Sequence, residues 1–181
     1  MADPPVWVMC PGKEVLMVSI MRRVLTDVFP EMVKKRAWAH VSGVSRCFTK
    51  DEFRSRGSHW AGKVAGRLVK QRGVDIVMDA DVESSKKLGD LLFKRLFEKR
   101  RDLGIQFLVW DEQTTINGKV QKHPIKPMTT EQRRAMKPWG LKSHLHRDHI
   151  HVEFDRVTGD QNNSKELENV LTAVKDAVGS P

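Results

Sequence analysis

The chain of 181 residues contains no tyrosine and only two cysteines, and it has fewer acidic than basic side chains. Cys10 and Cys47 are too few and too widely spaced for a sulfur-rich zinc site, which excludes that class of metal centre. No run of about 18 apolar residues occurs, so we expect no membrane-spanning helix. The opening residues 1–5 lack the basic and apolar regions of a secretory signal, which predicts synthesis in the cytoplasm without a signal peptide.

The positive charge of the chain limits the partners that it favours. Lysine and arginine number 32 against 23 aspartate and glutamate residues, a formal net charge of +9. Such a surplus favours polyanionic partners, which include nucleic acid, an anionic lipid surface and the anionic polymers of a bacterial envelope. Charge alone does not choose among these three.

The pattern of apolar residues predicts an α+β fold in a single domain spanning residues 1–181. We expect helices over Glu14–Val28 and Ser84–Leu103 and a third that begins at Ser164, with a short helix near residues 65–70 and another after Thr129 or Thr130. We expect strands over residues 36–44, 73–78, 105–110 and 149–154, and a hairpin turn at Asn117-Gly118. Because helices and strands do not alternate regularly, a central antiparallel sheet with flanking helices is the expected architecture.

Four of the seven histidines lie within eight residues, from His144 to His151. If this segment is a strand, its side chains alternate between the two faces. Ile150, Val152 and Phe154 then point into a core, whereas His149, His151 and Glu153 point the other way. This alternation of apolar and ligand-capable residues is typical of a metal or acid/base site on one face of a sheet.

Two residues elsewhere in the chain are candidate partners for this strand. His59 lies in a polar segment flanked by glycines, and Asp75 lies in a strand that is otherwise apolar. A lone carboxylate in such a strand is costly unless it is paired or bound to a metal. A hydrolytic zinc site needs about three nitrogen or oxygen ligands and an open position for water. The sequence therefore predicts a zinc site built from separated segments.

The order of these motifs resembles that of zinc peptidases that cut peptidoglycan peptides, the lysostaphin, D-alanyl-D-alanine metallopeptidase and hedgehog-like group. The most similar branches are the D-alanyl-D-alanine carboxypeptidases and the penicillin-insensitive murein endopeptidases. The resemblance extends from about residue 36 to residue 155, so the terminal helices are additions to it. The motifs that carry it are Val41-Ser42-Gly43-Val44-Ser45-Arg46, Ser58-His59, Gly73-Val74-Asp75-Ile76 and His146-Arg147-Asp148-His149-Ile150-His151-Val152.

The resemblance implies that zinc (Zn2+) is held by His59, Asp75 and His151. It implies a general base at Asp148 or at His149, because one branch of the family uses an acid three positions before the last ligand and another uses a histidine two positions before it. His59 and Asp75 are sixteen residues apart here, which places an insertion between them relative to the family pattern.

Three further residues complete the expected site. The resemblance implies an assisting role for His146, as in the murein endopeptidases, and a role for Arg46 in gripping a carboxylate or carbonyl of the substrate. Trp60 follows the expected ligand His59 directly in sequence, so its ring is a candidate for stacking on the substrate.

These observations together predict a zinc-dependent hydrolase that cleaves peptide bonds of bacterial peptidoglycan, as an endopeptidase or a carboxypeptidase. Its positive charge would hold it on anionic cell-wall polymers, so it would act at the wall or in the periplasm, for example as a phage lysin or a secreted effector. One alternative is a basic nucleic-acid-binding protein or histidine-metal nuclease, since its charge suits phosphate binding. Another is a catalytically inactive, wall-binding member of the same fold.

Overall fold

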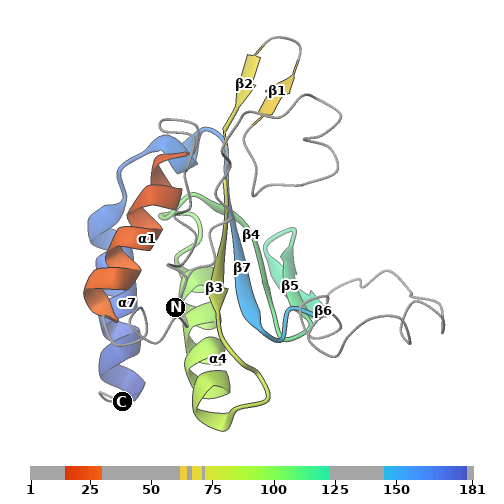
Figure 1. The fold of residues 1–181 in the computed structure, drawn as a ribbon, viewed down its shortest axis with the longest axis vertical. Coiled ribbons are helices and arrows are strands. Elements are labelled where there is room, and N and C mark those ends of the chain that lie inside the picture. Colours follow the sequence, from red (N-terminus) through yellow and green to blue (C-terminus); the bar gives the residue numbers. More distant parts are fainter. Residues whose placement is uncertain (1–14, 30–61, 65–66, 71, 123–144, 179–181) are drawn as a thin grey trace, which may run out of the picture.

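A five-stranded antiparallel sheet organises the fold, which confirms the expected α+β class (Figure 1). The computed structural model describes residues 15–29, 62–64, 67–70, 72–122 and 145–178. Within these ranges no helix has the length and apolar character that a bilayer crossing requires. The elements, in chain order, are α1 (Leu16–Val28), β1 (Gly62–Val64), β2 (Arg67–Val69), β3 (Gly73–Val77), α4 (Glu83–Glu98), β4 (Ile105–Trp110), β5 (Gln113–Ile116), β6 (Lys119–Lys122), β7 (His149–Phe154), the 3-10 turn η2 (Thr158–Asp160) and α7 (Ser164–Val178).

The strand order of the large sheet is β3-β7-β4-β5-β6, so the last strand of the chain lies near its centre. Strand β7 pairs with β3 on one side and with β4 on the other, antiparallel in both cases. In the first pairing Asp75 lies opposite His151 and Val77 lies opposite His149. This register brings residues that are far apart in sequence into neighbouring positions on one face of the sheet.

The alternation predicted for β7 is present in the structure. Ile150, Val152 and Phe154 are fully buried, whereas His149, His151 and Glu153 on the opposite face are only partly buried. The apolar side chains lie in the same core as Val74 and Ile76 of β3. Since neighbouring strands share one pleat, their remaining side chains share the other face. That second face carries the polar groups.

Helices α1, α4 and α7 cover the apolar face of the sheet (Figure 1). Each helix contributes a stripe of apolar side chains at three- and four-residue spacing, which is the pattern that an amphipathic helix uses against a core. The helices at the two ends of the described chain, α1 and α7, pack against each other. The buried residues of the stripes are Met17, Val18, Met21, Val24 and Leu25 in α1, Leu88, Leu92 and Leu96 in α4, and Leu167, Val170, Leu171 and Val174 in α7.

Gly89 gives α4 its close approach to β4. A Cβ atom at this position would lie 2.4 Å from Cζ2 of Trp110, a fully buried side chain. We predict that Gly89→Ala lowers the free energy of unfolding by about 1–3 kcal/mol, as overpacking does, although alanine is the better helix former. Urea denaturation measures this loss, with Lys94→Ala on the exposed side of α4 as the control. Equal stability of the two variants would contradict the prediction.

Two local expectations differ from the structure. The short helix expected near residues 65–70 is wrong, because Arg67–Val69 forms β2 and pairs with β1. The helix expected over Ser84–Leu103 begins one residue earlier and ends at Glu98, before a series of turns. The turn expected at Asn117-Gly118 is confirmed and joins β5 to β6. The strand expected over residues 36–44 and the helix expected after Thr129 or Thr130 lie outside the described residues.

Candidate functional site

Asp75 and His151 meet on the sheet face that lies opposite the helices. Oδ1 of Asp75 accepts a hydrogen bond from Nδ1 of His151 over 2.9 Å, although 76 residues separate the two in sequence. Nε2 of His149 lies 3.8 Å from the same carboxylate oxygen. The His149 and His151 side chains are only 13% and 12% exposed. The paired strands thus hold one carboxylate and two imidazoles in a largely dehydrated position.

Asp148 orients the ring of His149. Nδ1 of His149 donates a hydrogen bond to Oδ1 of Asp148 over 2.6 Å. Because an ionised carboxylate only accepts hydrogen bonds, this contact places a proton on Nδ1 of the imidazole. In the neutral ring Nε2 then carries the lone pair, and this nitrogen is the one that faces Asp75. The arrangement is a carboxylate–imidazole pair with a proton-accepting nitrogen directed into the site.

His146 lies over the two imidazoles of β7. Its ring centroid is 4.8 Å from that of His149 and 6.0 Å from that of His151. The backbone of His146 has a φ of 53°, in the left-handed region that costs a non-glycine residue roughly 1–2 kcal/mol. The turn that places this ring beside the site is therefore held by surrounding contacts, which compensate for the strain.

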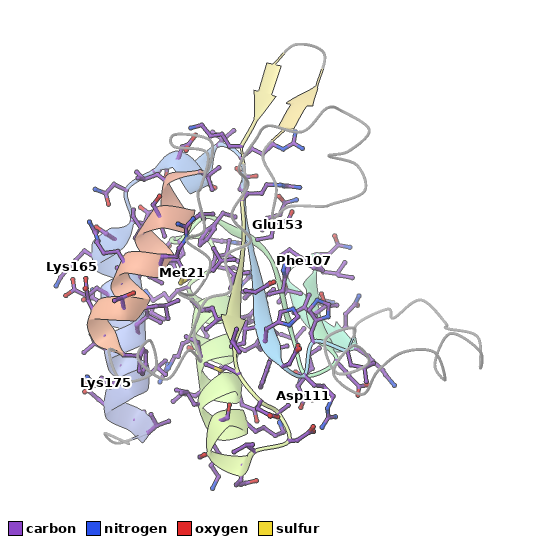
Figure 2. All side chains as sticks on the ribbon, viewed as in Figure 1. Met21, Phe107, Asp111, Glu153, Lys165 and Lys175 are labelled. Carbon is purple, nitrogen blue, oxygen red and sulfur yellow. The ribbon has the colours of Figure 1, made fainter. Side chains whose placement is uncertain are left out.

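Glu153 and Arg72 extend the polar face away from His149. Nη2 of Arg72 lies 2.9 Å from Oε1 of Glu153, and Nη1 donates to Oε1 of Gln106 over 3.0 Å. Oε2 of Glu153 lies 3.8 Å from Nε2 of His151. Figure 2 shows Glu153 and Phe107 on the side of the sheet away from Met21 of α1, and the Phe107 ring meets His151 edge-on. Arg72 was not among the residues predicted for the site, because its relation to Glu153 depends on strand register.

The two neighbouring carboxylates favour the charged form of His151. Burial, the largest single influence, lowers the pKa of this imidazole, but the interactions with Asp75 and Glu153 together outweigh it. The net result raises the pKa of His151 from 6.5 to about 9. The site therefore has a strong affinity for a positive charge at neutral pH.

We predict that the metal-free protein loses stability as the pH rises from about 6.5 to about 9. The folded-state pKa of His151 lies above the unfolded value, so its contribution is complete below the unfolded pKa and is lost as the pH passes the folded pKa. The full shift corresponds to about 3 kcal/mol. Urea denaturation of chelator-treated protein across this range measures the effect, and a His151→Gln variant provides the reference without it. Parallel stability profiles of the two proteins would contradict this prediction.

The structure brings together five of the eight residues predicted for the site: His146, Asp148, His149, His151 and Asp75. The other three, Arg46, His59 and Trp60, lie outside the described residues. Among the residues that the structure does describe, no three histidine, cysteine, aspartate or glutamate side chains form a group arranged to hold a metal ion. The expected third zinc ligand, His59, belongs to the part that is not described.

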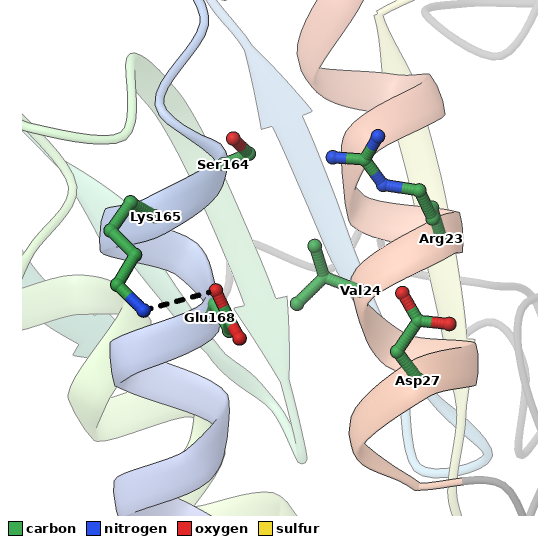
Figure 3. A pocket seen from close by; sticks show the side chains of 6 residues that line it. All are labelled: Arg23, Val24, Asp27, Ser164, Lys165 and Glu168. Atoms are coloured by element: carbon green, nitrogen blue, oxygen red, sulfur yellow. Dashed lines mark hydrogen bonds and ion pairs between the residues drawn. The ribbon is translucent and has the colours of Figure 1, made fainter.

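A depression between α1 and α7 has a different chemical character (Figure 3). Its lining includes no histidine or cysteine, and Lys165 forms an ion pair with Glu168 across 3.3 Å on its α7 side. Mixed charges on solvated helix surfaces are ordinary features of soluble proteins. The lining residues are Arg23, Val24, Asp27, Ser164, Lys165 and Glu168.

Comparisons with protein-family models, with curated proteins and with solved structures find no match to this chain. The chemistry of the site is accordingly inferred from its own residues and from the motif resemblance described above.

Proposed function

We propose that the protein is a zinc-dependent hydrolase that cleaves peptide bonds of bacterial peptidoglycan, as an endopeptidase or a carboxypeptidase. The observation that carries this proposal is the contact of Asp75 with His151 beside the hydrogen-bonded pair of Asp148 and His149. Two groups that suit zinc ligation thus lie next to a group that suits proton transfer. This is the combination that metal-assisted hydrolysis requires.

The distances within the site fit zinc. Two ligand atoms at bond lengths near 2.0 Å in a tetrahedral site are separated by about 3.3 Å. The Asp75 oxygen and the His151 nitrogen are 2.9 Å apart, so a movement of a few tenths of an ångström suffices. His59 would supply the third ligand, as the motif order implies. If Nδ1 of His151 binds the ion, Nε2–H faces Glu153, the carboxylate partner typical of metal-bound histidines.

The electrostatics of the site also fit a divalent cation. The carboxylates of Asp75 and Glu153, which raise the pKa of His151, produce a negative potential at the imidazole. In the metal-free protein a proton neutralises part of this potential. Metal ligation requires the imidazole to be deprotonated, so zinc would replace that proton.

The residues of the site would divide the catalytic work. Zinc bound there would polarise the scissile carbonyl and lower the pKa of a bound water to roughly 7. We assign the general base to His149, since its Nε2 faces Asp75 while Asp148 fixes the ring. His149 would take the proton from the attacking water and deliver it to the leaving amine. His146, above this ring, would stabilise developing charge.

The substrate assignment comes from the motif resemblance and from the charge of the chain. Arg46 would grip a carboxylate or carbonyl of the peptide, and Trp60 would stack on the substrate. The net charge of +9 would keep the enzyme on the anionic polymers of the cell wall. The protein would then act at the wall or in the periplasm.

Removal of the Glu153 charge tests its assignment as the carboxylate partner of a metal-bound His151. We predict that Glu153→Gln weakens zinc binding by roughly 10- to 100-fold, the range that such partners contribute. Competition with a zinc chelator measures the dissociation constant, and Glu98→Gln on the exposed surface of α4 is the matched control. An unchanged zinc affinity would remove Glu153 from the metal site.

Digestion of purified peptidoglycan sacculi tests the proposed function. Zinc-loaded protein is expected to release peptide fragments or free D-alanine, which chromatography and mass spectrometry identify, and chelation is expected to stop the release. Intact sacculi after incubation with folded, zinc-loaded protein would refute the proposal. If the same preparation cut DNA while sacculi stayed intact, the histidine-metal nuclease would replace it.

A further inference from the structure

We propose that Arg147 is a positioning residue whose ion network fixes the turn that presents His146, Asp148 and His149. This inference rests on the proposed function, because it concerns the proton-transfer pair of that site. Arg147 precedes Asp148 directly and makes no contact with His149 that the proposed chemistry uses. Its importance comes from the two segments that it ties together.

The backbone of the turn is held from two sides. On one side, the amides of Asp111 and Glu112 donate to the carbonyls of His146 and Leu145 over 2.8 and 3.2 Å. On the other side, the amide of Ala80 donates to the carbonyl of Arg147 over 2.7 Å, and the amide of Met78 donates to that of Asp148 over 2.9 Å. The turn is therefore clamped between the β4–β5 hairpin and the segment after β3.

Both elements that meet at this clamp carry backbone strain. Asp111 and Glu112 have φ values of 42° and 64°, and His146 has a φ of 53°. Three non-glycine residues in the left-handed region, directly bonded through their backbones, need compensating interactions nearby. Figure 2 shows Asp111 at the end of the sheet where β7 begins.

The side chain of Arg147 supplies such an interaction. Nη2 of Arg147 donates to Oδ1 of Asp81 over 2.6 Å, and Nη1 lies 3.5 Å from Asp111 and 3.7 Å from Glu112. Lys86 of α4 then holds the other oxygen of Asp111 at 3.0 Å. One guanidinium thus neutralises carboxylates on both sides of the turn, and its planar fork suits several partners at once.

The consequence for the site follows from chain connectivity. Loss of the guanidinium leaves the carboxylates of Asp81, Asp111 and Glu112 less compensated and removes the bridge between the two supports of the turn. Asp75 and His151 lie within paired strands, so their positions depend less on it. Arg147 would therefore affect the placement of Asp148 and His149 more than the zinc ligands. A displacement of about 1 Å at a catalytic group can cost roughly 100-fold in rate.

The first test measures amide hydrogen exchange in metal-free protein, so that it needs neither zinc nor substrate. In Arg147→Gln we expect the amides of Ala80, Asp111 and Glu112 to exchange at least about tenfold faster, while those of α7 keep their rates. Arg95→Gln, which breaks an exposed ion pair on α4, is the matched control and should leave these amides unchanged. Unchanged exchange in Arg147→Gln would overturn the clamp.

The second test measures sacculus cleavage by zinc-loaded variants. Arg147→Gln is expected to lower kcat by roughly 10- to 100-fold with zinc content and KM nearly unchanged, and Arg147→Lys is expected to restore part of the rate. Full kcat in Arg147→Gln, or loss of zinc in parallel with activity, would overturn the positioning role. Inactive wild-type protein would instead refute the proposed hydrolase, while the exchange experiment still decides whether the clamp exists.

Asp81→Asn provides a second route if Arg147→Gln does not fold. The Asp81 side chain is 54% exposed, so its replacement is compatible with folding. The same faster exchange and lower kcat are expected, with a smaller effect. In the double variant the two losses should not add, because both act through one interaction. Additive losses would show that Arg147 and Asp81 act independently and would contradict the clamp.

Discussion

His151→Ala is expected to reduce bound zinc from about one ion per chain to nearly none and to lower peptidoglycan cleavage at least about 1,000-fold. Asp75→Asn should have a similar effect, because its carboxylate contacts the same imidazole. The physical reason is that each replacement removes one of the three expected ligands and leaves too few to hold the ion. Elemental analysis measures the zinc, and chromatography of sacculus digests measures the activity.

Matched controls separate ligand loss from general damage. Asp176→Asn makes the same chemical change on the exposed surface of α7, so it should keep both zinc and activity. Circular dichroism of His151→Ala and Asp75→Asn should show the α+β fold of the wild-type protein. Full zinc content in either ligand variant would exclude that residue from the metal site, whatever its effect on activity.

His149→Ala is expected to lower kcat by roughly 100- to 10,000-fold, the usual contribution of a general base, while zinc content stays at the wild-type value. This separation of activity from metal content distinguishes the base from the ligands. Asp148→Asn should lower kcat by a smaller factor, because it removes the partner that orients the His149 ring without removing the accepting nitrogen. Steady-state kinetics on soluble peptidoglycan fragments measures both effects.

The relative size of these two losses decides between the two candidate bases. If Asp148→Asn abolishes turnover while His149→Ala retains most of it, the carboxylate is the base and the imidazole only supports it. Loss of zinc in His149→Ala would instead show that this histidine binds the metal. Either outcome would contradict the division of roles proposed here.

The sequence predicts the central part of the site because that part depends on short-range patterns. The period-two alternation of β7 places His149, His151 and Glu153 on one face, and the apolar neighbours of Asp75 mark its carboxylate as unusual. These inferences need only the geometry of a strand. The Asn117-Gly118 turn is equally local, since both residues tolerate the left-handed backbone that a two-residue hairpin requires.

The supporting parts of the site depend on register and on tertiary contacts, which local patterns do not reveal. Asp111 and Glu112 form a two-residue turn with positive φ at both positions, yet neither is a glycine. The partners of Arg147 come from two different loops, and Arg72 reaches Glu153 only because β3 pairs with β7. The position of β7 between β3 and β4 is likewise a property of the whole sheet.

The location of zinc in crystals of the metal-loaded protein tests the central claim most directly. Anomalous scattering at the zinc edge should give one strong peak at bonding distance, about 2.0–2.2 Å, from both the Asp75 carboxylate and the His151 imidazole, with His59 as a further ligand. A peak elsewhere on the molecule, or none on this face of the sheet at full zinc loading, would contradict the proposed hydrolase.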